Sequence, residues 1–275
     1  MKTGMKARKV SGFPGMAVVV FAVVMLSGPA LFAIEGTASI GLGYQLGITK
    51  NLDPAVQNGE EEEASVNHSF AFNLRYLPSP SLPVGVVLKG SVGGLSRMVW
   101  HNPAYDYIKG KTESQLTSGG SWGGFTNTQL VALKLYLPNE SYTFTKDDGT
   151  LLAYDVFIGG AFEIPLIRPV SVVVDAGFVF HGRNVSYEED LILGHTFSAN
   201  VNTTTIGFGL GIGAQFAFTD MFYAELGASL TYDFRQFSSI EVKVDNTSII
   251  DVSGKGRKAS YIYFGAPYIL IGVKL

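Results

Sequence analysis

The chain has 275 residues, a formal net charge of −3 and no cysteine. The absence of cysteine excludes disulfides and the lipid-modified cysteine of a lipoprotein, and the lack of a long lysine or arginine block gives no footprint for nucleic acid. Hydrophobic residues make up 47% of the chain and charged residues only 16%, and 33 glycines accompany 19 phenylalanines.

The N-terminal segment, residues 1–33, is predicted to be a cleavable signal peptide. Its basic residues are Lys2, Lys6, Arg8 and Lys9. An apolar run from Met16 to Leu26 follows, and small residues lead to Ala33. The run is too short for a spanning helix, which needs about 20 residues. We expect cleavage after Ala33, which leaves residues 34–275 as one exported domain.

The rest of the chain is dominated by alternation of bulky apolar residues with small or polar ones. In chain order the alternating stretches are 37–49, 69–77, 84–93, 155–164, 170–181, 205–218, 222–235 and 261–275. The clearest is Thr205 to Phe218, TIGFGLGIGAQFAF. A period of two gives a strand one apolar face, and these lengths suit a tilted bilayer crossing of about 9 to 11 residues. Because unpaired backbone groups are costly in lipid, such strands cross only as a closed barrel.

The region between the third and fourth stretches leaves the strand count open. Thr126 to Leu137 reads as a strand, and Tyr142 to Tyr154 reads as a hairpin that turns at Asp147-Asp148-Gly149. Counting both gives about ten strands. The arm from Ser141 to Lys146 has about half the length that a spanning strand needs. We therefore expect both segments to extend the second external loop.

Short and long connections alternate along the chain. The short turns are predicted at 78–83, 165–169 and 219–221, and long polar loops at 50–66, 182–202 and 236–258, the first with the acidic run Glu60 to Glu63. Short periplasmic turns and long external loops are typical of outer-membrane barrels. The predicted fold is all-β, a membrane-spanning antiparallel up-and-down barrel of about eight strands, with ten as the alternative.

Charged residues at inward positions of these strands form the main candidate site. They are Arg75, Lys89, Glu163, Asp175, Glu225, Asp233 and Arg235. Unpaired charges are costly in a narrow interior, so we expect these groups to pair. Two interpretations stay open: a closed, salt-bridged plug, or a polar path that opens when pairs exchange. The plug is favoured, because a barrel of about eight strands is just wide enough for its own side chains.

Aromatic residues near the external end form a second candidate site, the mouth of a ligand path. They are Trp100, Tyr105, Tyr107 and Trp122, and the alternative interpretation is an interfacial girdle. The histidines are His68, His101, His181 and His195, and they lie near predicted external strand ends or loops. They are interpreted as solvated, and Asp147-Asp148-Gly149 as a turn; the alternative is a protease-like site at the barrel rim, in which Asp147 and Asp148 join His181 or His195. No catalytic residue, metal site or cofactor is predicted.

The signal peptide, the alternating strands and the terminal YILIGVKL together resemble small bacterial outer-membrane barrels of the OmpW, OmpX and OmpA transmembrane type. The chain differs from the usual terminal Phe of such families by ending at Leu275. Resemblance to OmpW implies passive passage of small hydrophobic solutes across the outer membrane. Resemblance to OmpX or OmpA implies a surface-exposed, adhesive role, in which loops bind a host or envelope ligand. Either places the chain in outer-membrane lipid.

Overall fold

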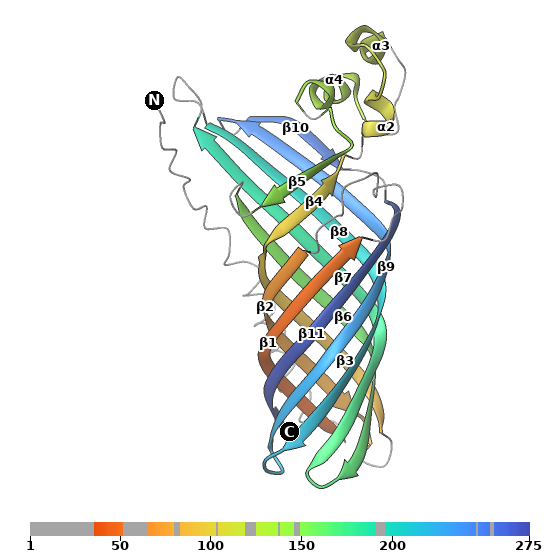
Figure 1. Ribbon diagram of the computed structural model, residues 1–275, viewed down its shortest axis with the longest axis vertical. Helices are drawn as coiled ribbons and strands as arrows, with labels where there is room; N and C mark the ends of the chain where they lie inside the picture. Colours follow the sequence, from red (N-terminus) through yellow and green to blue (C-terminus); the bar gives the residue numbers. More distant parts are fainter. Residues whose placement is uncertain are drawn as a thin grey trace.

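The computed structural model describes residues 36–51, 65–79, 83–102, 104–118, 125–136, 138–145, 149–190, 196–245, 247–253 and 256–275. The predicted signal peptide and most of the predicted loop 50–66 lie outside these ranges. A tall antiparallel sheet wraps into a cylinder (Figure 1). Its strands are β1 (Thr37–Asn51), β2 (Ser65–Leu77), β3 (Val84–Leu95), β6 (Thr150–Ile167), β7 (Val170–Asp190), β8 (Thr196–Ala217), β9 (Phe222–Val244) and β11 (Arg257–Lys274).

These eight strands close into a ring. The order is β1-β2-β3-β6-β7-β8-β9-β11, and β11 pairs with β1 to complete the circle. Every pairing is antiparallel. Closure matters in lipid because it gives every strand two hydrogen-bonded neighbours and leaves no open edge. The predicted eight-stranded, all-β up-and-down barrel is confirmed.

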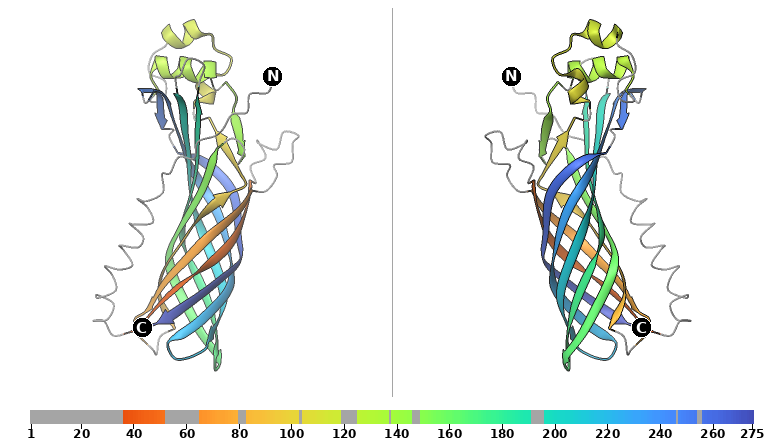
Figure 2. Two further views of the ribbon diagram at one scale, coloured as in Figure 1. Left: turned by 90° about the vertical axis from the view of Figure 1, so that its left-hand side faces the viewer. Right: turned by 90° about the vertical axis from the view of Figure 1, so that its right-hand side faces the viewer.

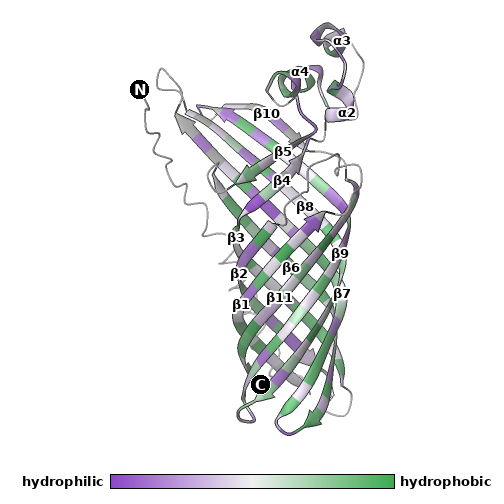
Figure 3. Cartoon of the chain, viewed as in Figure 1, coloured by the Kyte–Doolittle hydropathy of each residue, from purple (hydrophilic) through white to green (hydrophobic). Residues whose placement is uncertain are grey.

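The outer face of the ring is apolar. Outward residues include Leu210, which is 61% exposed, and Ile271, which is 67% exposed, while glycines and polar residues alternate with them on the inner face. Figure 3 shows the apolar residues concentrated over the cylinder and polar ones above it. Among the described residues no helix is long and apolar enough to cross a membrane. The strand faces therefore form the lipid contact.

Three neighbouring strands continue well beyond the ring. β7, β8 and β9 contain 21, 22 and 23 residues, about twice what a bilayer crossing needs. They carry a further strand, β10 (Thr247–Ser253), which pairs with β9. The described residues of 182–202 and 236–258, which were predicted as loops, are mostly strand, so the prediction was wrong there. One face of each extension is polar like a loop, but the other holds the buried side chains of Val185, Val201 and Ile240.

A folded segment between β3 and β6 sits on these extensions (Figure 2). Its elements are β4 (Arg97–His101), α2 (Tyr105–Ile108), α3 (Glu113–Ser118), α4 (Asn127–Tyr136) and β5 (Ser141–Thr145). We call this segment, together with the extensions of β7 to β9 and with β10, the head. β4 and β5 pair with each other in a separate sheet, so the described residues up to Thr145 add no strand to the ring, as expected. Residues 150–154, which were also predicted to extend the loop, instead belong to the ring strand β6.

The local structure inside this segment differs from the prediction. The segment 126–137 was predicted as a strand, but its residues Asn127–Tyr136 form the helix α4. Thr126 and Gln129 cap each other, and Leu130 and Leu133 share one buried face. The predicted hairpin at Tyr142–Tyr154 is also wrong, since β5 pairs with β4 and not with β6. Its predicted turn at Asp147 and Asp148 lies outside the described residues.

The opposite end of the barrel carries short connections. β6 ends at Ile167 and β7 begins at Val170, and β8 and β9 are joined across 218–221. The C-terminal Leu275 exchanges backbone hydrogen bonds with Ala38 of β1, at 2.7 and 3.2 Å. Short turns lie on the periplasmic side of such barrels, so the head faces the outside of the cell.

The lipid contact can be tested at Leu210. Replacing Leu210 with arginine should destabilise the barrel by about 2–4 kcal/mol, the cost of a cation near the bilayer centre. Asn202→Arg is the matched control, since Asn202 lies on the same strand and the same outward face, four outward positions higher. Urea unfolding in lipid vesicles measures both. Equal stabilities for the two variants would contradict the membrane placement.

Candidate functional site

The lower part of the lumen is occupied by an ion-paired cluster around Arg75. The Arg75 guanidinium on β2 contacts both carboxylate oxygens of Glu225 on β9, at 3.2 and 3.4 Å, and lies 3.7 Å from Asp175 on β7. All three side chains are at most 1% exposed. The Tyr268 hydroxyl donates to Glu225 at 2.9 Å. Two-pronged contact between a guanidinium and a carboxylate is a strong, orientation-specific arrangement, so this cluster ties three strands together across the lumen.

Lysines extend the cluster in both directions. Lys89 Nζ lies 2.5 Å from Asp175 Oδ2 and 4.9 Å from the centre of the Tyr268 ring. Nearer the periplasmic end, Lys274 Nζ lies 2.9 Å from Glu163 Oε1. Tyr268 fits beside Gly213, where an added Cβ would lie 2.6 Å from the tyrosine hydroxyl. The glycine-rich inner face therefore makes room for a charged and aromatic filling.

A second cluster lies higher in the lumen, around His181 of β7. Its Nδ1 lies 2.7 Å from Asp155 Oδ1, which also accepts a hydrogen bond from Arg183 at 2.7 Å. Its Nε2 lies 3.6 Å from Asp233 Oδ1, and Thr205 donates to Asp233 at 2.5 Å. His181 is buried, so its prediction as a solvated residue at an external strand end was wrong. His181 and Asp175 are separated by an even number of residues on β7, so their side chains lie on the same face of the strand. This spacing was the signal that could have placed His181 inside the barrel.

Two small cavities remain between these groups. One, of about 60 Å³, lies between the clusters, and the other, of about 80 Å³, lies above the second cluster. His181 and Tyr263 line both, and their rings are 4.6 Å apart. Each cavity is large enough for a few water molecules. In the described part of the chain, no three His, Asp or Glu side chains are arranged to hold a metal ion.

Most of the predicted inward charges lie in the lumen, but Arg235 does not. Arg75, Lys89 and Asp175 form one contact group with Glu225, and Asp233 belongs to the upper cluster. The Arg235 side chain is exposed outside the barrel, with its guanidinium 5.5 Å from the Phe237 ring centre. A β-bulge shifts the ladder between β8 and β9 at this point, so the residues above it change face.

Two residues of the predicted aromatic mouth, Trp100 and Tyr107, pack in the core of the head. Trp100 is 0% exposed and lies 6.0 Å from Tyr142, between ring centres. Tyr107 packs on Phe125 at 5.6 Å. Trp100 therefore cannot line an open mouth, and the prediction was wrong for this residue. Tyr105 is half-buried below Lys109, and Trp122 lies outside the described residues.

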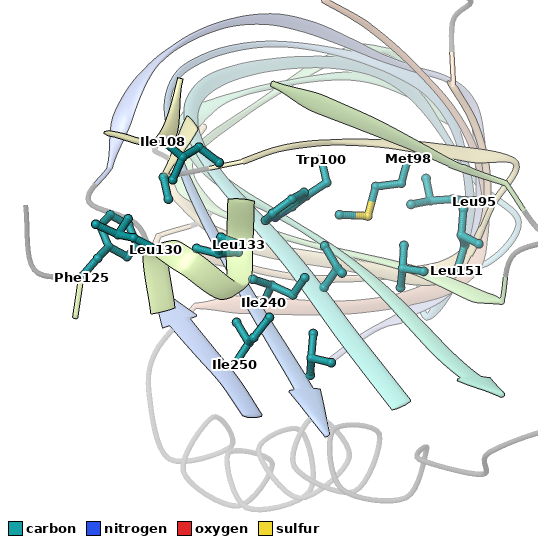
Figure 4. Packing of buried hydrophobic residues seen from close by; sticks show 14 of the residues in the cluster. Leu95, Met98, Trp100, Ile108, Phe125, Leu130, Leu133, Leu151, Ile240 and Ile250 are labelled. Atoms are coloured by element: carbon teal, nitrogen blue, oxygen red, sulfur yellow. The ribbon is translucent and has the colours of Figure 1, made fainter. Parts of the chain in front are cut away.

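The head has a hydrophobic core of its own (Figure 4). Side chains from α2, α4 and β4 meet the inner face of the strand extensions there. The core includes Leu95, Met98, Trp100, Ile108, Leu116, Leu130, Leu133, Val185, Val201, Ile240 and Ile250. The sequence prediction missed this core because these residues come from nine separate elements, so no single stretch of the sequence marks it.

The closed ring, its apolar exterior and its charged lumen define a bacterial outer-membrane β-barrel protein. No family model and no curated protein sequence matches the chain. Among solved structures it is similar to a major outer membrane protein from Thermus thermophilus, with 13% identity over 86% of this chain and 99% of that chain, at a TM-score of 0.45. It is also similar to Neisserial surface protein A, with 10% identity over 88% and 99% of the two chains, at a TM-score of 0.43. A third is Ail, the attachment invasion locus protein of Yersinia pestis, with 15% identity over 88% and 100%, at a TM-score of 0.39.

Proposed function

We propose that the protein recognises a ligand at the cell surface, with the barrel serving as an anchor for the head. The main support for this proposal is the separate hydrophobic core of the head, in which Trp100, Leu130 and Leu133 are fully buried. Flexible loops need no such core. A packed head holds its exposed residues in fixed positions, which lowers the entropy lost when a partner binds.

The filled lumen supports the same proposal. Ion pairs bridge it around Arg75 and again around His181. Opening an axial path would separate buried charges, which is costly when one partner is left unpaired. The barrel is better suited to anchoring than to continuous conduction.

Passage of a small hydrophobic solute, the other function implied by the resemblance, has weaker support. The two lumenal cavities of about 60 and 80 Å³ are lined by charged groups such as Lys89, Asp155 and Arg183. A hydrophobic solute would have to displace water from these groups without replacing its hydrogen bonds. Swelling of liposomes containing the protein in small aromatic solutes would favour passage over recognition.

The proposal is tested by removing residues 97–145 of the head while keeping the ring and the strand extensions; we call this variant the headless barrel. Residues 97–145 are replaced by a short Gly-Ser linker, and Val201 and Ile240 are changed to threonine because the deletion uncovers them. We expect the headless barrel to fold and resist denaturation in detergent, while cells that display it lose adhesion to plates coated with extracellular-matrix glycoproteins. The control is the same chain with only the two threonine substitutions.

Each outcome separates the two functions. Unchanged adhesion of headless cells, with no solute uptake by either variant, would overturn recognition through residues 97–145. Solute uptake that survives removal of the head would instead assign the activity to the barrel.

A further inference from the structure

Three neighbouring strands carry a basic residue at the upper boundary of the apolar belt. Counting outward positions from the periplasmic end, the first charged residue is Lys50 on β1, Arg235 on β9 and Lys258 on β11. These strands are adjacent in the ring in the order β9-β11-β1. We call these three residues the basic rim.

The basic rim is local to one side of the barrel. The outward positions of β3, β6 and β8 hold no charged residue over their full lengths. The first charged outward residue on β7, Glu188, follows Asn184 and Ser186 in the head. Positive charge is thus concentrated on the wall formed by β9, β11 and β1.

The side chains of the basic rim have no acidic partner among the described residues. All three are exposed, and none belongs to the ion pairs within the described ranges. Among the described residues, Arg235 contacts the carbonyl of Gly256, at 3.5 Å, and the Phe237 ring. Arg235 and Lys258 are direct register partners. Like charges opposite each other on one face repel, so an anion bound between them would stabilise this arrangement.

The depth of the basic rim identifies the kind of anion. Below it on the same strands lie the exposed apolar side chains of Tyr232, Phe264 and Ile48. These residues lie within the belt that contacts lipid chains. Above them on each strand, the first charged outward residue is the one in the basic rim, so the rim lies toward the level of the head groups. We propose that the basic rim binds phosphate groups of the outer-leaflet lipid, and that it anchors one side of the barrel to that lipid.

The test compares a rim variant with a matched head variant. The rim variant is Lys50→Gln/Arg235→Gln/Lys258→Gln. The head variant, Lys109→Gln/Lys134→Gln/Lys243→Gln, removes the same number of charges from the head. Native mass spectrometry after purification with bisphosphorylated lipid A measures retained lipid. Both variants are first checked for the folded, detergent-resistant form, since outward substitutions at this level leave the lumen unchanged.

We expect the rim variant to bind bisphosphorylated lipid A on the order of tenfold to a hundredfold more weakly than the parent protein, and the head variant to match the parent. Dephosphorylated lipid should bind the parent protein as weakly as bisphosphorylated lipid binds the rim variant. Excess inorganic phosphate should not displace bisphosphorylated lipid A from the parent protein. If the rim variant retains as much bisphosphorylated lipid A as the parent protein, the apolar belt alone holds the lipid. The same follows if the parent protein retains as much dephosphorylated as bisphosphorylated lipid. Displacement by inorganic phosphate would show that the basic rim takes free phosphate. Any of these three results overturns the proposal.

Discussion

Replacing Arg75 with methionine is expected to destabilise the folded barrel by about 3–5 kcal/mol. The substitution keeps much of the side-chain volume but removes the guanidinium that Glu225 and Asp175 share in the lower lumen. Asp175 keeps Lys89 at 2.5 Å, whereas the described ion partner of Glu225 is lost. A buried carboxylate without its cation is costly in a low-dielectric interior. Urea unfolding in lipid vesicles, followed by far-ultraviolet circular dichroism, measures the effect.

Two further variants show whether the cost arises from the unpaired charge. Lys109→Met removes an exposed lysine from the head and should change the unfolding free energy by no more than about 0.5 kcal/mol. The double variant Arg75→Met/Glu225→Gln removes both partners and should recover part of the stability lost in Arg75→Met. If Arg75→Met is as stable as the parent protein, the cluster does not hold the strands together.

The ring could be predicted from the sequence because one simple rule governs it. In lipid every spanning strand needs an apolar outer face, and the period of two is visible without knowledge of the partner strands. The same parity placed Arg75, Lys89 and Asp175 inside. It also applied to Asp155 and His181, whose pairing at 2.7 Å follows from their direct register between β6 and β7.

The rest depended on features that parity cannot show. The bulge near Phe234 adds one residue to β9 and moves Arg235 from the lumen to the outer wall. In the head, strand faces are buried by contacts from distant segments, so the polar residues between Val185 and Val201 resembled a loop. The helix 127–136 had a local signal, the Thr126 and Gln129 capping pair, but its apolar residues also fitted a strand.

The independence of the head core leads to a prediction that the barrel alone does not make. Trp100→Ala should destabilise the packing of the head by about 3–5 kcal/mol, because a fully buried indole is lost from the centre of that core. The ring strands make none of their ladder pairings with β4, so the barrel should keep its resistance to detergent. Limited proteolysis of the protein in lipid vesicles should then cut within 97–145 at protease concentrations that leave the parent protein intact.

Leu135→Ala is the matched control, since this leucine of α4 is 58% exposed and its removal leaves no cavity. Protection of the head in Trp100→Ala would mean that the extensions of β7 to β9 hold residues 97–145 without this core, whereas unfolding of the whole barrel would mean that head and ring are one cooperative unit.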